Sequence, residues 1–206
     1  MTATALIAFV LAAGLLTVTP GIDTALVLRT AGVEGARKAA LAGLGIALGC
    51  LAWGVFVALG LGLLLQASEL AYTILRWAGA AYLVWLGIKL IRSRREGPIE
   101  AEAERTGGGG GWFWRGLLTN LLNPKVGIFY VSFLPQFIPA GADVQSTTIL
   151  LAAIHAGLGL AWFGALILAT RPIAAALRRP GTVRLLDRLT GGLFLMFGAR
   201  LALVRD

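Results

Sequence analysis

Long apolar runs separated by short polar segments dominate the sequence. A helix needs about 20 residues to cross the hydrocarbon core of a bilayer. Six apolar stretches reach that length, and they cover roughly residues 3–28, 39–65, 70–91, 117–138, 148–170 and 185–204. The second stretch contains no charged residue. The pattern predicts an all-α polytopic membrane protein with six transmembrane helices.

Composition indicates that lipid rather than water surrounds these helices. Hydrophobic residues make up 58% of the 206-residue chain and charged residues 14%. A soluble domain has about 45–50% apolar and about 25% charged residues. The excess of apolar side chains therefore needs a surrounding other than water, and we expect membrane lipids to supply it.

Basic residues alternate between the connections. Of the 18 Lys and Arg residues, 14 lie in or beside the connections that follow the first, third and fifth spans. Lys and Arg collect in cytoplasmic loops of membrane proteins. This places both termini outside and the basic loops in the cytoplasm, and it accounts for the net charge of +8 without a nucleic-acid partner.

The sequence offers little for an enzyme. One cysteine, Cys50, excludes an internal disulfide, and with a single histidine it leaves no metal-ligand cluster. The run Gly107–Gly111 lacks the Lys-Ser/Thr that follows in a phosphate-binding loop. We therefore expect no cofactor, no metal and no enzymatic activity. A transport role remains, and one candidate is an exporter or channel for a small cargo such as a metal ion, a drug or another metabolite.

Three short segments recur in the same order in the two halves of the chain. GLLT is repeated, LAWG matches LAWFG, and YLVWLGIKL matches LFLMFGARL, with offsets that rise from 102 to 111 residues. Each half has three spans, an odd number, so the halves must be inverted, which is a transporter architecture. We predict a first three-helix repeat (1–92), a cytoplasmic Gly-rich linker (93–115) and a second three-helix repeat (116–206).

The first and fourth spans differ from the others because they carry polar residues and helix breakers. Pro20 with Gly21, and Pro124, interrupt backbone hydrogen bonding. Broken helices at corresponding places in two halves are the best sequence pointer to a transporter's binding site. We predict a substrate-binding site made of Thr19, Pro20, Gly21, Asp23, Asn120, Asn123, Pro124 and Lys125.

Two opposite charges lie beside these breaks. Asp23 is the acid deep in the first span, and Lys125 is the cation deep in the fourth. One hypothesis is that they hold a zwitterion, with Lys125 on its carboxylate and Asp23 on its ammonium group, and that Asp23 also carries a coupling proton. The alternatives are a structural Asp23–Lys125 ion pair and a capping role for Asp23. His155 is either a second proton-coupling residue or a core histidine.

Small residues recur at helical spacing in two spans. Gly45 and Gly49 form one ridge, and Gly157, Ala161 and Ala165 form another. Such ridges let helix backbones approach closely in a bilayer. Both ridges are expected at helix contacts, and they leave a homodimer open.

Two longer segments resemble the signatures of a known family. TPGIDTALVLRTAGVEGARKAALAGLGIALG (Thr19–Gly49) is similar to the opening signature of the LysE/RhtB amino-acid exporters, which include the homoserine/threonine efflux branch. GLLTNLLNPKVGIFYVSFLPQF (Gly116–Phe137) is similar to its second signature, and GARLAL (Gly198–Leu203) also fits. The likeness covers nearly the whole chain except residues 92–111.

The resemblance implies secondary active export of neutral or cationic amino acids, or close derivatives, from a bacterial cytoplasm. It implies proton antiport with alternating access, and it places two triplets along the pathway: Pro20, Gly21 and Asp23, and Asn123, Pro124 and Lys125. One position departs from the family. The family commonly has Pro-Gly-Pro at this break, whereas this chain has Ile22 at the third position. We therefore expect a less rigid break.

Overall fold

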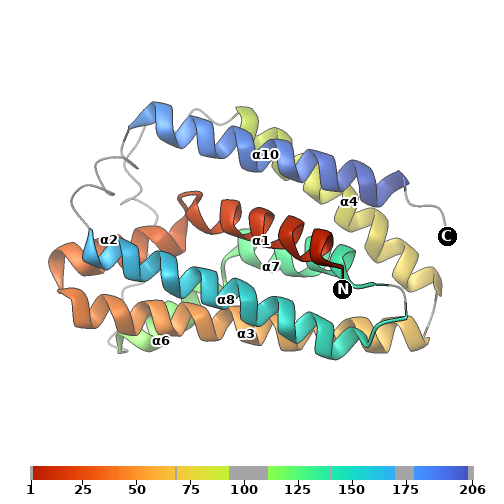
Figure 1. Cartoon of the computed structure of the whole chain (residues 1–206), viewed down its shortest axis with the longest axis horizontal. Coiled ribbons are helices and arrows are strands. Elements are labelled where there is room, and N and C mark those ends of the chain that lie inside the picture. Colours follow the sequence, from red (N-terminus) through yellow and green to blue (C-terminus); the bar gives the residue numbers. More distant parts are fainter. Residues whose placement is uncertain (1, 68, 93–110, 140, 170–178, 204–206) are drawn as a thin grey trace.

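The computed structural model describes residues 2–67, 69–92, 111–139, 141–169 and 179–203. Every element in these residues is helical, which confirms the all-α part of the prediction. Figure 1 shows the arrangement of the helices. In chain order they are α1 (Ala3–Val18), α2 (Ile22–Val33), α3 (Ala36–Ala67), α4 (Glu69–Arg92), α6 (Trp112–Leu121), α7 (Pro124–Ile128), a π-helix η1 (Phe129–Phe133), a 3₁₀ helix η2 (Leu134–Phe137), α8 (Val144–Leu168) and α10 (Pro180–Leu203).

Breaks divide the two expected spans that carry prolines. The bend between α1 and α2 is 53°, and the bend between α6 and the helical stretch Pro124–Phe137 is 51°. Pro124 occupies the first position of α7, where a backbone N–H would have no partner within the helix, so proline removes no helical hydrogen bond there. Asn123 caps that helix, since its Oδ1 accepts a hydrogen bond from the Lys125 backbone N–H at 3.0 Å. The α1–α2 break forms with Ile22 as the first residue of α2.

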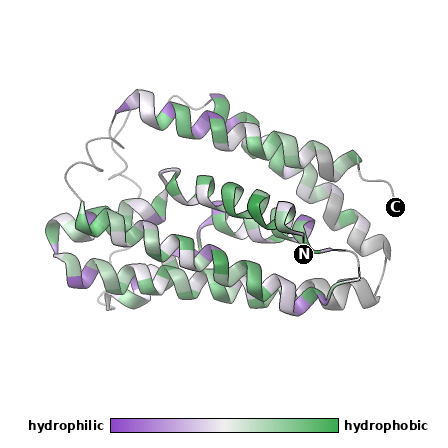
Figure 2. Cartoon of the chain, in the orientation of Figure 1, coloured by the Kyte–Doolittle hydropathy of each residue, from purple (hydrophilic) through white to green (hydrophobic). Residues whose placement is uncertain are grey.

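The helix lengths and apolarity agree with a membrane protein. Within the described residues, α3 and α8 are each long and apolar enough to span a bilayer, and the two bent pairs raise the number to as many as four. α4 and α10 have 24 residues each but do not meet that test. The count of six spans therefore stays a prediction. Hydrophobic residues colour most of the length of the helices in Figure 2, and Leu11, Ile7 and Phe56 are 68%, 60% and 59% exposed.

Helices from the two halves of the chain pack against one another. α3 lies between α6 and α8, and α4 packs along α10. Figure 1 shows that α3 and α8 run in opposite directions, as do α4 and α10. These are the pairs that an inverted repeat would relate to each other. The repeat itself remains a prediction.

Glycines allow α3 and α6 to touch through their backbones. A Cβ atom on Gly45 would collide with the carbonyl oxygen of Phe113, and a Cβ atom on Gly116 would collide with that of Ala42. Gly49, one turn after Gly45, also faces α6. The first predicted ridge is thus confirmed as a helix contact.

A second close crossing joins α4 to α10. A Cβ atom on Gly87 would lie 2.7 Å from the Gly191 carbonyl oxygen, and a Cβ atom on Gly191 would lie 2.7 Å from the Gly87 carbonyl oxygen. The contact is reciprocal, so neither position accepts a side chain without separating the two backbones.

Two expectations need correction. The ridge of Gly157 and Ala161 does not face another described helix, because both residues are exposed and nothing lies within 4 Å of a Cβ atom placed on Gly157. Small size alone does not reveal which side of a helix faces the bundle. The second concerns the linker: α6 begins at Trp112, so residues 112–115 are helical, while 93–110 lie outside the described residues.

We predict that Gly116→Ala destabilises the fold, because the added methyl group would push α6 away from the α3 backbone. Overpacking of this kind typically costs about 1–3 kcal/mol. Thermal unfolding of the detergent-solubilised protein measures the effect. Gly157→Ala is the matched control and should leave the unfolding temperature within error of wild type. Equal unfolding temperatures for Gly116→Ala and the control would contradict this packing.

Candidate functional site

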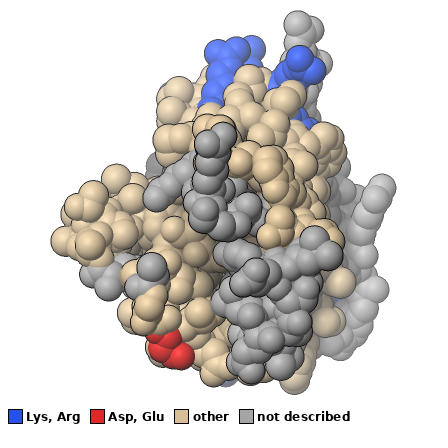
Figure 3. All heavy atoms as spheres, turned by 90° about the vertical axis from the view of Figure 1, so that its right-hand side faces the viewer, with Lys and Arg blue, Asp and Glu red and all other residues tan. Residues whose placement is uncertain are grey.

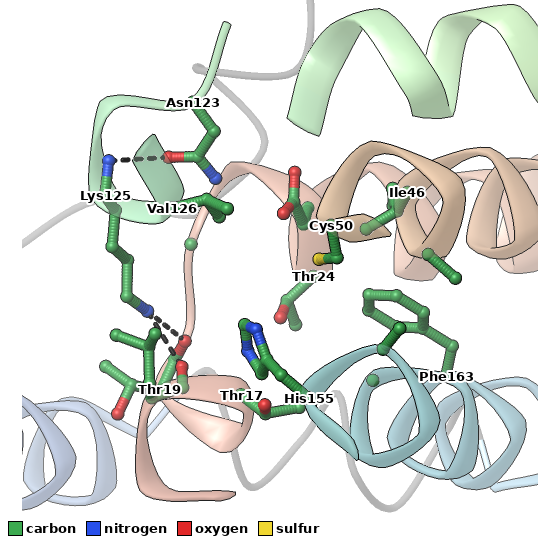
Figure 4. A pocket seen from close by; sticks show the side chains of 16 residues that line it. Thr17, Thr19, Thr24, Ile46, Cys50, Asn123, Lys125, Val126, His155 and Phe163 are labelled. Carbon is green, nitrogen blue, oxygen red and sulfur yellow. Dashed lines mark hydrogen bonds between the residues drawn. The ribbon is translucent and has the colours of Figure 1, made fainter. Parts of the chain in front are cut away.

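A small cavity lies where the two helix breaks meet (Figure 4). Its volume is about 50 Å³, which is room for a few water molecules. The lining comes from α1 and α2 around the first break, from α3, from the α6–α7 break and from α8. The cavity therefore joins elements from both halves of the chain.

The structure brings most of the predicted site residues to this cavity. Those that line it are Thr19, Gly21, Asp23, Asn123, Lys125 and His155. Three others, Pro20, Asn120 and Pro124, are not part of the lining. Pro124 is exposed, whereas Asn120 is fully buried behind the cavity wall. The lining also includes Thr17, Thr24, Cys50 and Phe163, which the predicted site omitted.

Lys125 reaches across to the end of α1. Its Nζ atom donates hydrogen bonds to the carbonyl oxygens of Leu16 and Thr19, each at 3.0 Å (Figure 4). In an unbroken helix the Leu16 carbonyl would accept from the backbone N–H four residues later. That residue is Pro20, which has no N–H. The Lys125 ammonium group thus takes the place of the donor that Pro20 lacks.

The second break also has substitute hydrogen-bond donors. Pro124 lies four residues after Asn120, so the Asn120 carbonyl also loses its regular helical donor. The Trp53 indole Nε1 of α3 donates to this oxygen at 3.4 Å, and the Asn123 backbone N–H donates to it at 3.1 Å. Trp53 also packs on Gly127, where a Cβ atom would lie 2.8 Å from the indole ring.

Asp23 has its own partner in the buried amide of Asn120. Its Oδ2 atom accepts a hydrogen bond from Asn120 Nδ2 at 2.9 Å. Its Oδ1 atom is buried and has no hydrogen-bond partner among the described residues. Asp23 lies in the first turn of α2, where the helix dipole favours a negative charge. The hydrogen bond from Asn120 therefore holds the carboxylate in place at the cavity.

The hydrogen bonds described above give the two charged side chains separate partners, and the structural ion pair stays an untested alternative. Lys125 donates to the carbonyls of α1, and Asp23 accepts from Asn120. The salt bridge found within the described residues is Lys38–Glu34 at 2.6 Å, outside the cavity, where the hydrogen bond from Lys38 lowers the pKa of Glu34. Asp23 does not cap α2, because the N-cap residue is Gly21.

His155 contributes an imidazole from α8. The side chain is 5% exposed, and its Nδ1 atom lies 3.1 Å from the Tyr130 hydroxyl oxygen. Tyr130 belongs to η1, and π-helical turns occur frequently at functional sites. The histidine is both a hydrogen-bonded core residue and a member of the cavity lining.

A hydroxyl pair connects the first break to α10. Thr19 Oγ1 donates to the Leu15 carbonyl at 2.6 Å and lies 2.6 Å from Thr190 Oγ1. Because the single hydroxyl proton of Thr19 is used in the first bond, Thr190 is the donor in the second. Thr190 is fully buried. The sequence prediction missed it, although a polar residue within an apolar span is itself a signal of an interior position.

We predict that Thr190→Val lowers the free energy of unfolding by about 1 kcal/mol, the typical net contribution of one hydrogen bond. Thr190→Ser keeps the donor and should stay close to wild type. Chemical denaturation in detergent, followed by tryptophan fluorescence, measures the difference. If the serine variant lost as much stability as the valine variant, the loss would reflect packing rather than the hydroxyl contact.

Comparison with known proteins identifies the chain. The family model described as "LysE type translocator" matches residues 15–205. The chain belongs to the LysE family of translocators. It is therefore a membrane transporter rather than an enzyme, and the resemblance of its two signature segments to this family is confirmed.

The relatives of this LysE-family chain match along nearly their full length. A homoserine/homoserine lactone efflux protein of Salmonella typhi is 36% identical over 200 residues, which cover 96% of each chain. A threonine efflux protein of Escherichia coli (strain K12) is 33% identical and covers 90% of this chain and 91% of its own. A leucine efflux protein of Klebsiella pneumoniae is 30% identical, with 91% and 89% covered. No solved structure matches the chain.

Proposed function

We propose that this LysE-family chain exports small amino acids from the bacterial cytoplasm by proton antiport, with the substrate bound in the cavity between the two helix breaks. The observation that carries the proposal is the presence of an acid, Asp23, and a cation, Lys125, in one cavity of a largely apolar bundle. The substrates named for the three relatives are amino acids or a close derivative, each with an amino group.

The cavity suits the two charged groups of an α-amino acid. The ammonium group would bind the Asp23 carboxylate, whose Oδ1 atom has no partner among the described residues. The carboxylate would bind Lys125, together with backbone N–H groups at the start of α2. Gly21 caps that helix in an extended conformation without a side-chain hydrogen bond, and helix N-termini attract anions.

Exchange of substrate for a proton follows from competition at one carboxylate. Asp23 can neutralise its charge either by binding an ammonium group or by taking a proton, and these two states exclude each other. Antiport results if the carboxylate meets each water-filled side in turn. His155 supports this role from the opposite wall as a second group able to hold a proton.

Alternating access would have to enlarge the cavity on one side at a time. The pairing of α3 with α8 and of α4 with α10 supports two inverted repeats, the architecture in which rocking of packed bodies exposes a central site. The broken helices at that site support the same mechanism.

The distribution of charge supports an inner-membrane orientation with basic ends in the cytoplasm. Arg37 and Lys38 begin α3, Arg92 ends α4, and Arg184 and Arg188 lie in the first turns of α10. The start of α1 and the end of α10 lie toward the other end of the bundle in Figure 1. Figure 3 shows the molecule from that end: the Lys and Arg atoms visible on this face lie near its top, and most of its described surface is uncharged. We place both termini outside.

We predict that Asp23→Asn abolishes proton-driven export. The asparagine keeps the size of the side chain but has no negative charge. It therefore can neither pair with the ammonium group nor take up a proton. The measurement is uptake of homoserine and threonine into inverted vesicles, or proteoliposomes of the same orientation, with and without an imposed pH gradient.

Asp143→Asn is the matched control for this substitution. Asp143 is an exposed carboxylate at the start of α8, and hydrogen bonds from Ser146 lower its pKa, so it stays ionised throughout the assay range. Export with this variant should equal wild type. Unchanged gradient dependence in Asp23→Asn would refute the coupling role, and no transport of any amino acid by wild type would refute the proposed function.

We predict that Lys125→Ala weakens binding of α-amino acids more than binding of the corresponding amines that lack a carboxylate. Loss of a charge-assisted hydrogen bond typically costs about 1.5–3 kcal/mol, or roughly 10- to 100-fold in affinity. Competition of each compound against labelled threonine measures the two affinities. Equal losses for amino acid and amine would show that Lys125 acts only by holding the end of α1.

A further inference from the structure

Phe163 lines the cavity at the end opposite Lys125. Figure 4 shows Lys125 and Asn123 on one side of the cavity and Ile46 and Phe163 on the other, with Thr24 between them. Phe163 comes from α8 and Ile46 from α3, and both are buried. The cavity thus has a charged end at the helix breaks and an apolar end between α3 and α8.

Two glycines make room for the Phe163 ring. A Cβ atom on Gly43 of α3 would lie 3.3 Å from Phe163 Cδ2, and a Cβ atom on Gly159 of α8 would lie 3.8 Å from Phe163 Cε2. The ring therefore lies flush against the α3 backbone and extends beneath the turn that carries Gly159. It is only 6% exposed. Its position is defined by backbone on two sides.

We propose that Phe163 sets the size limit for the side chain of the exported amino acid. The inference rests on the proposed function, in which Asp23 and Lys125 bind the ammonium and carboxylate groups. With the carboxylate at Lys125, the substrate side chain points toward Phe163 and Ile46. Because the buried Phe163 ring fills space at this end, it restricts the end to short side chains such as those of homoserine and threonine.

The relatives are named for substrates whose side chains differ in size. One is named for homoserine export, one for threonine and one for leucine. A single extra methylene changes discrimination in an apolar pocket by roughly 10- to 200-fold. A phenyl ring is much larger than a methylene, so its removal is expected to change the choice of substrate measurably.

The test is the ratio of leucine transport to homoserine transport by purified full-length protein in proteoliposomes. Phe163→Ala should raise this ratio at least about tenfold. Phe163→Leu should give an intermediate increase and protects the test against poor folding of the alanine variant. Phe56→Ala is the matched control: it truncates the same residue type at a site on α3 that is 59% exposed, and the ratio should not change.

Gly159→Ala tests the same end of the cavity in the other direction. The added methyl group would make ordinary contact with the Phe163 ring and would occupy part of the lining. We expect the leucine-to-homoserine ratio to fall at least twofold while the protein remains folded, as measured by its elution as a single species in detergent.

The outcomes separate this inference from the proposed function. If wild type transports homoserine but the ratio is unchanged in Phe163→Leu, Phe163→Ala and Gly159→Ala, the size limit lies elsewhere and the inference fails while the proposed function stands. If wild type transports no amino acid, the proposed function itself fails. An equal rise in the ratio in Phe56→Ala would also overturn the assignment, because the effect would then be unspecific.

Discussion

A helix that breaks inside a bilayer leaves carbonyl groups that no water can satisfy, and the way this chain satisfies them organises its site. Pro20 removes the donor for Leu16, and the Lys125 ammonium group replaces it. Pro124 removes the donor for Asn120, and the Trp53 indole approaches that oxygen. Lys125 and Trp53 are both distant in sequence from the carbonyl groups to which they donate, and the Asn123 N–H adds a local donor at the second break. Because Lys125 belongs to the second break, its hydrogen bonds to the end of α1 also hold the two breaks together.

This arrangement gives the acid and the cation that share the cavity separate hydrogen-bond partners. Lys125 is held by carbonyl oxygens, and Asp23 is held by the amide of Asn120. A direct ion pair would satisfy both charges and leave less reason to bind a zwitterion. In the proposed mechanism, hydrogen bonds to neutral groups keep both side chains in place at the cavity. The first break is further tied to α10 through Thr19 and Thr190.

The sequence predicted the features that depend on local chemistry. Pro20 and Pro124 indicate breaks because proline lacks a donor wherever it occurs, and the charges of Asp23 and Lys125 must avoid lipid in any fold. The particular partners could not be predicted, since Leu16 and Lys125 are 109 residues apart. The outward position of Gly157, the role of Phe163 and the π-helical turn at Tyr130 also depend on how the helices rotate and pack. Those rotations are set by many contacts at once, and no single local pattern specifies them.

The reciprocal glycine contacts limit which parts of the molecule can move as units. Gly87 and Gly191 join α4 to α10, and Gly45 and Gly116 join α3 to α6. Each pair takes one helix from each half of the chain. Sliding the halves past each other would drive these backbones into collision. The mobile bodies of a transport cycle would therefore each combine helices from both halves, so the mechanical boundary would not coincide with the boundary between the two predicted repeats.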